Sequence, residues 1–253
     1  MPVSNVHPMT TRSKAGIFKP KAFGTSKTKA ASMDYTITEP LSFKVATKYK
    51  QWCTAMDEEF DALTRQGTWV LVPPTPTQNI VGCKWVFKLK HNNDGCINKY
   101  KARLVAKGFH QQYGIDFDET FSPVIKPPTL RIILSLAVQF NWPLRQLDVR
   151  NAFLHGVLKE EVYMVQPQGY VDPIFPNHVY RLQKSLYGLK QALRAWFERF
   201  SSHLLHLGFL ASLANSSLFI LRHGKFLVYL LVYVDDIVLT GNYPSFLQSI
   251  LLN

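Results

Sequence analysis

The stretch from Phe226 to Thr240, FLVYLLVYVDDIVLT, constrains the fold more than any other part of the chain. Nine apolar or aromatic residues lead into two adjacent carboxylates, Asp235 and Asp236, and three apolar residues follow. The β-branched and aromatic content predicts two short buried strands that meet at a tight turn. The run is well short of the roughly 20 residues that span a bilayer. We therefore expect a sheet that brings two charges to a hairpin tip.

Two carboxylates beside a buried sheet repel each other and lose hydration, which costs several kcal/mol per uncompensated ion. A divalent metal ion would offset that cost. A solvated Asp-Asp hairpin tip is the alternative, and the dipeptide by itself does not separate the two interpretations. The rest of the chain has to decide between them.

Composition indicates a globular protein with a polyanionic partner. The chain has 253 residues, 47% of them hydrophobic, and 29 basic against 17 acidic residues give a net charge of +12. This balance favours nucleic acid or an anionic membrane surface as the partner. Three cysteines without a CxxC pair or zinc-ligand spacing indicate free thiols. No signal peptide or membrane span is evident, so we expect a cytoplasmic or nuclear protein that is not secreted.

The N-terminal segment differs in composition from the rest. Residues 1–33 are rich in Thr, Ser, Lys and Pro and contain no acidic residue before Asp34. We expect a disordered basic linker over residues 1–38 and a folded domain over residues 39–253. A solvated linker and an RNA-contacting or nuclear-localisation segment both remain open.

Periodicity predicts the elements of the first half. A three-and-four spacing of apolar residues predicts an amphipathic helix over residues 42–63, and a strand follows at 68–72. Strands at 80–90 and 97–106 flank Asp94-Gly95, a hairpin turn signal. Alternation would place many cations of this hairpin on one face, either for phosphates or as a solvated surface. These cations are Lys84, Lys88, Lys90, Lys99, Lys101, Arg103 and Lys107.

The second half alternates helices and strands. A helix should begin at Pro127, with a buried stripe of Leu130, Ile133, Leu134, Ala137 and Val138, and end before Asn141. Strands are expected at 144–149, 161–165, 178–182 and 218–221, with a helical stretch at 151–158. A long helix should cover residues 188–207, and its predicted buried stripe includes Leu193. Asp148, at a strand end, fits a helix N-cap or a third carboxylate of a metal site.

Seven motifs, taken together in this order, resemble the reverse transcriptase domain of copia-type LTR retrotransposon Pol polyproteins. They are KWVFKLK (84–90), YKARLVAKGF (100–109), ETFSPV (119–124), QLDVRNAFLHG (146–156), EEVYMVQPQG (160–169), KSLYGLKQALRAW (184–196) and LLVYVDDI (230–237). The resemblance implies an α+β right-hand polymerase of fingers and palm, with an antiparallel palm sheet packed on helices. The thumb would be absent.

The resemblance also implies the site residues. Asp148, Asp235 and Asp236 would be catalytic and, with Val149, would bind two Mg²⁺ ions, with Mn²⁺ as a substitute. The family places nucleotide contacts at positions that correspond to Lys101, Arg103, Phe153, Tyr187, Gly188, Lys190 and Gln191. Phe153 would exclude ribonucleotides, or else be an ordinary core residue. Arg103 and Lys101 would hold the triphosphate, and Gly188 would let the backbone approach the nucleotide.

The implied function is RNA-directed DNA synthesis on an RNA or DNA template-primer from deoxynucleoside triphosphates. Leu193 replaces a family proline and Asn215 a family aspartate. Because the chain ends at Asn253, we expect an incomplete enzyme without primer grip, thumb or ribonuclease H. A non-catalytic nucleic-acid-binding remnant is the main alternative, and another palm-type nucleotidyl enzyme, such as a cyclase, is a third. The sequence does not indicate an oligomeric state.

Overall fold

The computed structural model describes residues 34–149 and 151–251. The chain divides into two units, Met1–Asp34 and Tyr35–Asn253. Most of the expected linker, residues 1–33, lies outside the described residues. The folded unit begins earlier than the expected Glu39, because the Trp52 indole N–H donates to the Tyr35 carbonyl at 2.7 Å and the Tyr100 hydroxyl to the Thr36 carbonyl at 2.6 Å.

The described residues form an α+β fold, as the sequence predicts. The α-helices are α1 (Phe43–Ala46), α2 (Lys50–Arg65), α3 (Pro127–Gln139), α4 (Ala192–His206) and α5 (Pro244–Leu251), with short 3-10 helices η1 (Gly108–His110) and η2 (Ala152–His155). The strands are β1 (Trp69–Val72), β2 (Ile80–Val81), β3 (Cys83–His91), β4 (Ile97–Ala106), β5 (Leu144–Asp148), β6 (Val157–Met164), β7 (Val179–Lys184), β8 (Leu210–Ala211), β9 (Leu218–His223), β10 (Phe226–Tyr233) and β11 (Asp236–Gly241). None of these helices is long and apolar enough to cross a bilayer.

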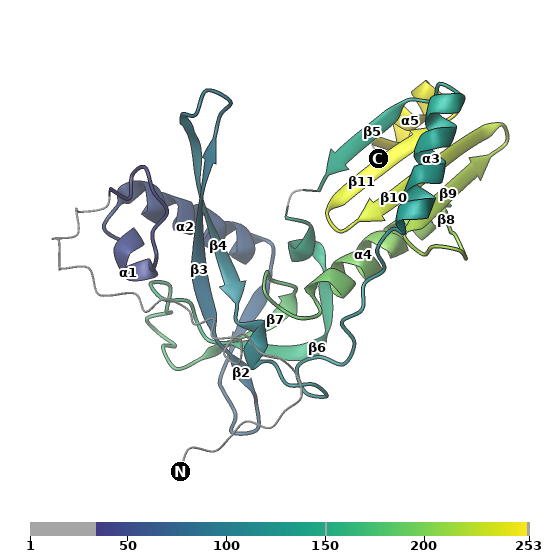
Figure 1. Ribbon diagram of the computed structural model, residues 1–253. Helices are drawn as coiled ribbons and strands as arrows, with labels where there is room; N and C mark the ends of the chain where they lie inside the picture. The colour runs from purple at the N-terminus through teal and green to yellow at the C-terminus, as the bar shows by residue number, and fades with distance from the viewer. Residues whose placement is uncertain (1–33, 150, 252–253) are drawn as a thin grey trace, which may run out of the picture. The chain divides into compact units, whose positions relative to one another are not determined.

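The N-terminal elements share one core. A four-stranded sheet has the order β1-β7-β6-β2, and β3 and β4 form a separate two-stranded hairpin. Helix α2 packs along β4 (Figure 1). Its Trp52 has no exposed surface and meets Phe87 and Tyr100 of the hairpin edge-to-face at 5.3 and 4.9 Å. Aromatic pairs of this kind add about 0.5–1.5 kcal/mol each beyond burial, so the hairpin is held firmly against α2.

The C-terminal elements form a sheet with helices on both faces. Its order is β5-β11-β10-β9-β8, and all of its pairs are antiparallel (Figure 1). Alternate residues of β10 point to opposite faces, which is why Leu230 packs with α4 and α5 while Leu231 packs with α3. Strand β10 is therefore apolar along its whole length, and the predicted buried hairpin of β10 and β11 is confirmed.

Several predicted boundaries were wrong. The helix expected over residues 42–63 is two helices, because the extended Tyr49 interrupts it. The stretch expected to be helical at 151–158 is only the short η2, and β6 already begins at Val157. The helix expected from Gly188 starts at Ala192, since Gly188 has a φ of +90°. Val138 and Leu193, both predicted to be buried, are 77% and 38% exposed.

Candidate active site

The tip of the β10–β11 hairpin is a strained turn held from two sides. Tyr233 and Asp236 are the last paired residues, so Val234 and Asp235 form the loop. Val234 has a φ of +59°, which is costly for a β-branched residue, of the order of 1–3 kcal/mol. The Trp196 indole N–H of α4 donates to the Val234 carbonyl at 2.9 Å, and the Val149 N–H donates to the Asp235 carbonyl at 3.0 Å. These two bonds fix the turn.

The pairing of β5 with β11 brings the third carboxylate to this tip. Asp148 lies directly opposite Asp236, and such cross-strand neighbours share one face of a sheet. The Asp236 carboxylate accepts a hydrogen bond from the Gln146 amide at 3.1 Å. Asp148 and Asp235 line a common cleft of about 730 Å³ together with Val149. Asp148 and Asp236 thus lie on neighbouring strands of one sheet, and Asp235 lies in the turn that adjoins them.

The carboxylates at this tip are ligands of the type that Mg²⁺ prefers, although they do not form a complete coordination shell. Across residues 34–149 and 151–251, no three His, Cys, Asp or Glu side chains gather closely enough to hold a metal ion. Mg²⁺ prefers oxygen ligands, and it is usually held by one or two carboxylates together with substrate phosphates. Asp148 and Asp235, which line the cleft at this tip, fit that pattern.

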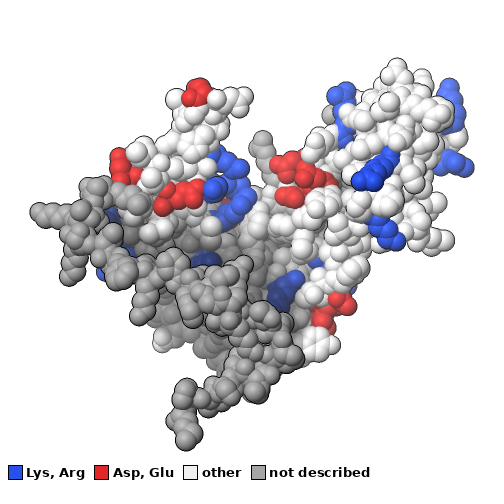
Figure 2. All heavy atoms as spheres, in the orientation of Figure 1, with Lys and Arg blue, Asp and Glu red and all other residues white. Residues whose placement is uncertain are grey.

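The β3–β4 hairpin supplies a basic wall, as alternation predicts. Lys88 lies opposite Lys101, and Lys90 opposite Lys99, so these cations share a face while Trp85, Phe87 and Leu89 of the other face are buried. Lys88 pairs with Glu39 at 3.1 Å and Lys99 with Glu58 at 3.3 Å. Lys90 and Lys101 line the same cleft as the carboxylates, and Figure 2 shows acidic and basic groups near one another on this face.

Arg103 belongs to a cluster with two aromatic rings. Its guanidinium lies 4.8 Å from the ring centroid of Tyr187, and Phe153 meets Tyr187 edge-to-face at 5.4 Å. The Tyr187 hydroxyl donates to the Asn151 side chain at 3.5 Å, and burial raises the pKa of Tyr187. The Arg103 Nε atom is buried and has no hydrogen-bond partner among the described residues. Three of the predicted nucleotide contacts thus lie together.

Gly188 approaches protein backbone closely. The Ala106 N–H donates to the Tyr187 carbonyl at 2.8 Å, which draws this loop onto β4. A Cβ atom on Gly188 would lie 2.1 Å from the Ala106 carbonyl oxygen, and the φ of +90° is itself one that glycine adopts most readily. Packing against β4 therefore accounts for this glycine without a bound nucleotide.

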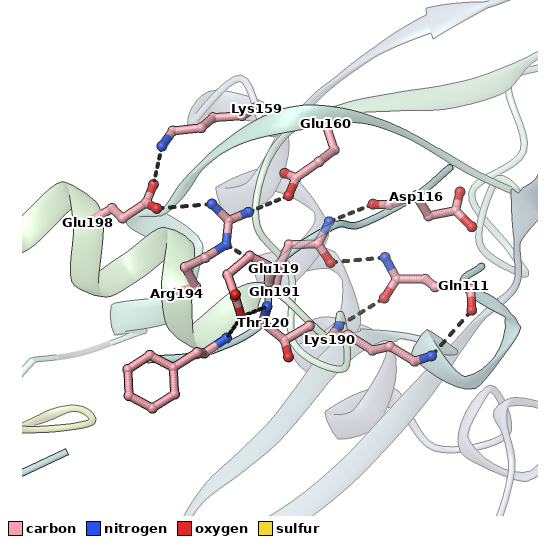
Figure 3. A network of polar contacts seen from close by, with 11 residues as sticks. Gln111, Asp116, Glu119, Thr120, Lys159, Glu160, Lys190, Gln191, Arg194 and Glu198 are labelled. Carbon is pink, nitrogen blue, oxygen red and sulfur yellow. Dashed lines mark hydrogen bonds and ion pairs between the residues drawn. The ribbon is translucent and has the colours of Figure 1, made fainter. Parts of the chain in front are cut away.

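Lys190 and Gln191, the remaining predicted nucleotide contacts, take part in internal hydrogen bonds (Figure 3). The Lys190 ammonium donates to the Gln111 carbonyl at 3.3 Å and lies 4.4 Å from the Phe117 ring centroid. Gln191 has no exposed surface; its amide N–H donates to the Asp116 carbonyl at 2.8 Å, and its oxygen accepts from Gln111 at 3.0 Å. Gln191 therefore supports the loop that carries Lys190 and is not exposed to a ligand.

Sequence reasoning missed a buried arginine beside this loop. Arg194 is 8% exposed; its Nε donates to the Glu119 carbonyl at 2.7 Å, and its other nitrogens bind Glu160 and Glu198. We call these residues the anchor network: Gln111, Asp116, Glu119, Glu160, Lys190, Gln191, Arg194 and Glu198. An arginine on an amphipathic helix has the sequence signature of a solvated residue, so only its place in the RAW motif could have drawn attention to it.

The two departures from the family pattern have mild local consequences. Leu193 lies in the first turn of α4, where a proline would also be tolerated because its N–H is not needed there. Asn215 is 3% exposed; its oxygen accepts from the Ser217 N–H at 3.0 Å, and its amide donates to the Thr129 hydroxyl at 3.3 Å. The asparagine side chain thus acts both as an acceptor, for Ser217, and as a donor, to Thr129.

Comparison with known proteins identifies the family. The family model described as reverse transcriptase (RNA-dependent DNA polymerase) matches residues 66–251. The Retrovirus-related Pol polyproteins from transposons RE1 and RE2 of Arabidopsis thaliana are each 51% identical, over 98% and 94% of this chain. That from transposon TNT 1-94 of Nicotiana tabacum is 44% identical over 80% of it. The chain spans only 16–17% of the length of these relatives. It belongs to the reverse transcriptase family, as a domain of the copia-type retrotransposon Pol polyproteins.

Proposed function

We propose that this domain carries the nucleotidyl-transfer centre of an RNA-directed DNA polymerase. The observation that carries the proposal is the position of Asp148 opposite Asp236 on neighbouring strands, with Asp148 and Asp235 lining one cleft. The substrates would be an RNA or DNA template-primer and deoxynucleoside triphosphates. In this proposal the β5–β11–β10–β9–β8 sheet is the palm, and the β3–β4 hairpin with α2 belongs to the fingers.

Each part of the cleft has a proposed role. Asp148 and Asp235 would hold Mg²⁺, with Val149 beside them and Asp236 as the further ligand expected from the family. When bound, the metal would neutralise phosphate charge and lower the pKa of the primer 3′-hydroxyl. Lys101 and Arg103 would bind triphosphate oxygens, for which a guanidinium fork is well shaped. Phe153, stacked edge-on against Tyr187, would exclude a ribose 2′-hydroxyl.

The chain's own contribution is mainly alignment. The strained turn is fixed by Trp196 and Val149 before any substrate arrives, so the carboxylates need little reorganisation. Preorganised charge of this kind supplies much of the rate in phosphoryl and nucleotidyl transfer. In this proposal the domain contributes the fixed geometry of the turn and no general base.

One observation favours a second candidate, a nucleic-acid-binding domain without turnover. The Asp236 carboxylate is engaged by Gln146, and the described residues contain no complete three-carboxylate group. Such a domain would bind template-primer through its basic wall with strong salt dependence. It would show no metal-dependent extension.

Two measurements on the whole chain separate these candidates. In Mn²⁺ titrations followed by electron paramagnetic resonance, we expect binding by the wild type and at least about tenfold weaker binding by Asp235→Asn and Asp148→Asn. In primer extension with Mg²⁺, Asp235→Asn should lower incorporation by about 10²–10³-fold. Asp118→Asn, which removes an exposed carboxylate outside the cleft, is the matched control.

The outcomes are distinct. Equal Mn²⁺ binding and equal extension by the wild type and Asp235→Asn would rule out the proposed site. Specific Mn²⁺ binding without any extension, but with salt-dependent binding to template-primer, would favour the second candidate.

A further inference from the structure

Helix α2 contributes two carboxylates to the cleft. Four of its residues line the cleft, Ala55, Glu58, Glu59 and Ala62, and only the two glutamates are polar. They line the same cleft as Lys101 of β4, the strand along which α2 packs. A site proposed to bind a triphosphate thus has negative charge built into its wall, and this charge is separate from Asp148 and Asp235.

The two glutamates differ in their partners. Glu58 forms a solvent-exposed ion pair with Lys99 at 3.3 Å, in which both side chains are about 60% exposed. Glu59 is half-buried and forms no ion pair within 4.0 Å with another described residue. Its Oε1 atom is buried and has no hydrogen-bond partner within the part of the chain that the structure describes. Only Glu59, therefore, has an uncommitted buried oxygen at the cleft.

Two cations near Glu59 have no ion-pair partner within 4.0 Å among the described residues. Burial raises the pKa of Glu59, and the charges of these two cations, Lys101 and Arg103, lower it. Burial and the neighbouring Arg103 lower the pKa of Lys101, whereas Glu59 raises it. Glu59 therefore favours the charged form of Lys101 without forming a direct ion pair with it.

We propose that Glu59 is the resting counter-ion of Lys101 and Arg103 and that it competes with an incoming triphosphate for these two cations. The inference rests on the function proposed above and concerns the nucleotide side of the same cleft. A triphosphate brings several negative charges to the cations, so Glu59 changes from a favourable neighbour in the free domain to a repulsive one in the complex. Glu59 thereby limits the affinity of the site for anions.

The test is calorimetric titration of the full chain with inorganic tripolyphosphate, without divalent metal and at low ionic strength. Glu59→Gln keeps the shape of the side chain and removes its charge. We expect about tenfold tighter binding, the effect of one charge several ångströms away at an effective dielectric constant of about 20. Glu58→Gln, which removes an exposed and solvent-screened charge, should change the affinity less than about twofold.

A purely structural role for Glu59 would not produce a gain of affinity. The gain should also shrink as salt is added, since the competing charges are screened. Thermal melting of each variant shows whether the fold is retained, and Lys101→Ala shows whether the ion binds at the basic wall. Binding by Glu59→Gln that equals or is weaker than that of the wild type would overturn the inference.

The same titrations separate this inference from the proposed function. If the wild type binds tripolyphosphate and Lys101→Ala weakens it, but Glu59→Gln changes nothing, only the counter-ion role fails. If neither the wild type nor Glu59→Gln binds, the triphosphate site itself fails and the inference with it. Binding by Glu59→Gln alone would support both.

Discussion

The anchor network and the carboxylate cleft contain similar side chains in opposite states. In the anchor network, every side chain has at least one hydrogen-bond or ion-pair partner, and Arg194 alone contacts three acceptors. In the cleft, Asp148, Asp235 and Lys101 have no side-chain hydrogen bond or ion pair with another described residue, and the turn that carries Asp235 is strained. Both regions are formed by residues far apart in the sequence and both are folded. They differ in whether their polar side chains are paired.

The contrast indicates which polar groups stabilise the fold and which are available to bind a ligand. Buried polar groups are normally paired, because an unpaired one costs about 1–3 kcal/mol. In the cleft, Asp148 is exposed and Asp235 and Lys101 are partly exposed, so water solvates these charges in the free domain and a ligand can replace that water. We therefore expect substitutions in the anchor network to act on stability, and those in the cleft to act on binding.

The largest expected effect tests the structural side of this comparison. Arg194→Met removes the cation and leaves Glu160, whose side chain is 11% exposed, without its ion pair. The free energy of unfolding in urea should fall by about 3–5 kcal/mol, as for other broken buried pairs. Arg199→Met, an exposed arginine on the same helix, should change it by less than about 0.5 kcal/mol. A loss below 1 kcal/mol for Arg194→Met would break the comparison.

A smaller loss of stability is expected at Gly188, where the loop before α4 packs against β4. Gly188→Ala combines a positive φ with a Cβ atom 2.1 Å from a carbonyl oxygen, so we expect a loss of about 2–4 kcal/mol in urea unfolding. Gly95→Ala is the matched control, because Gly95 has a φ of +83° and no atom near the added Cβ. Its loss should be about 1 kcal/mol. Equal losses would mean that contact with β4 does not require glycine.

The smallest effect concerns the cleft turn. Val234→Gly removes the strain of a φ of +59°, which stabilises the folded state, but it also raises the conformational entropy of the unfolded chain. Because these effects oppose each other, the free energy of unfolding should rise by no more than about 1 kcal/mol. Val238→Gly, at a regular position of β11, should instead lower it by about 2 kcal/mol. Destabilisation of similar size at both positions would show that the turn stores no strain.

The sequence predicted the features that depend on local periodicity. The period of two in β3 and β4 placed Lys88 and Lys101 on one face, and the apolar runs around Asp235 defined the hairpin. The approach of Asp148 to the tip was expected from the family resemblance and appears as strand pairing. The alternation in β3 and β4 and the apolar runs of β10 and β11 can each be recognised within a short stretch of sequence.

Features that depend on distant partners were beyond sequence reasoning. The acceptors of Arg194 lie on three separate segments, so its burial has no periodic signature. Gln191 was assigned to nucleotide contact because of its motif, yet its amide is used by Gln111 and Asp116. The exposure of Val138 likewise depends on how α3 lies on its sheet, which the helical period alone does not determine.

Because Asp148 pairs with Asp236, the face on which its side chain lies depends on the register of β5. Side chains alternate along a strand, so deletion of a single codon within β5 would turn Asp148 to the opposite face, whereas many substitutions in that strand would leave it in place. The connecting segments between the two strands can change length without this effect. Short in-frame indels in β5 or β11 should therefore separate the Asp148 and Asp236 side chains, even where the DD dipeptide is still intact.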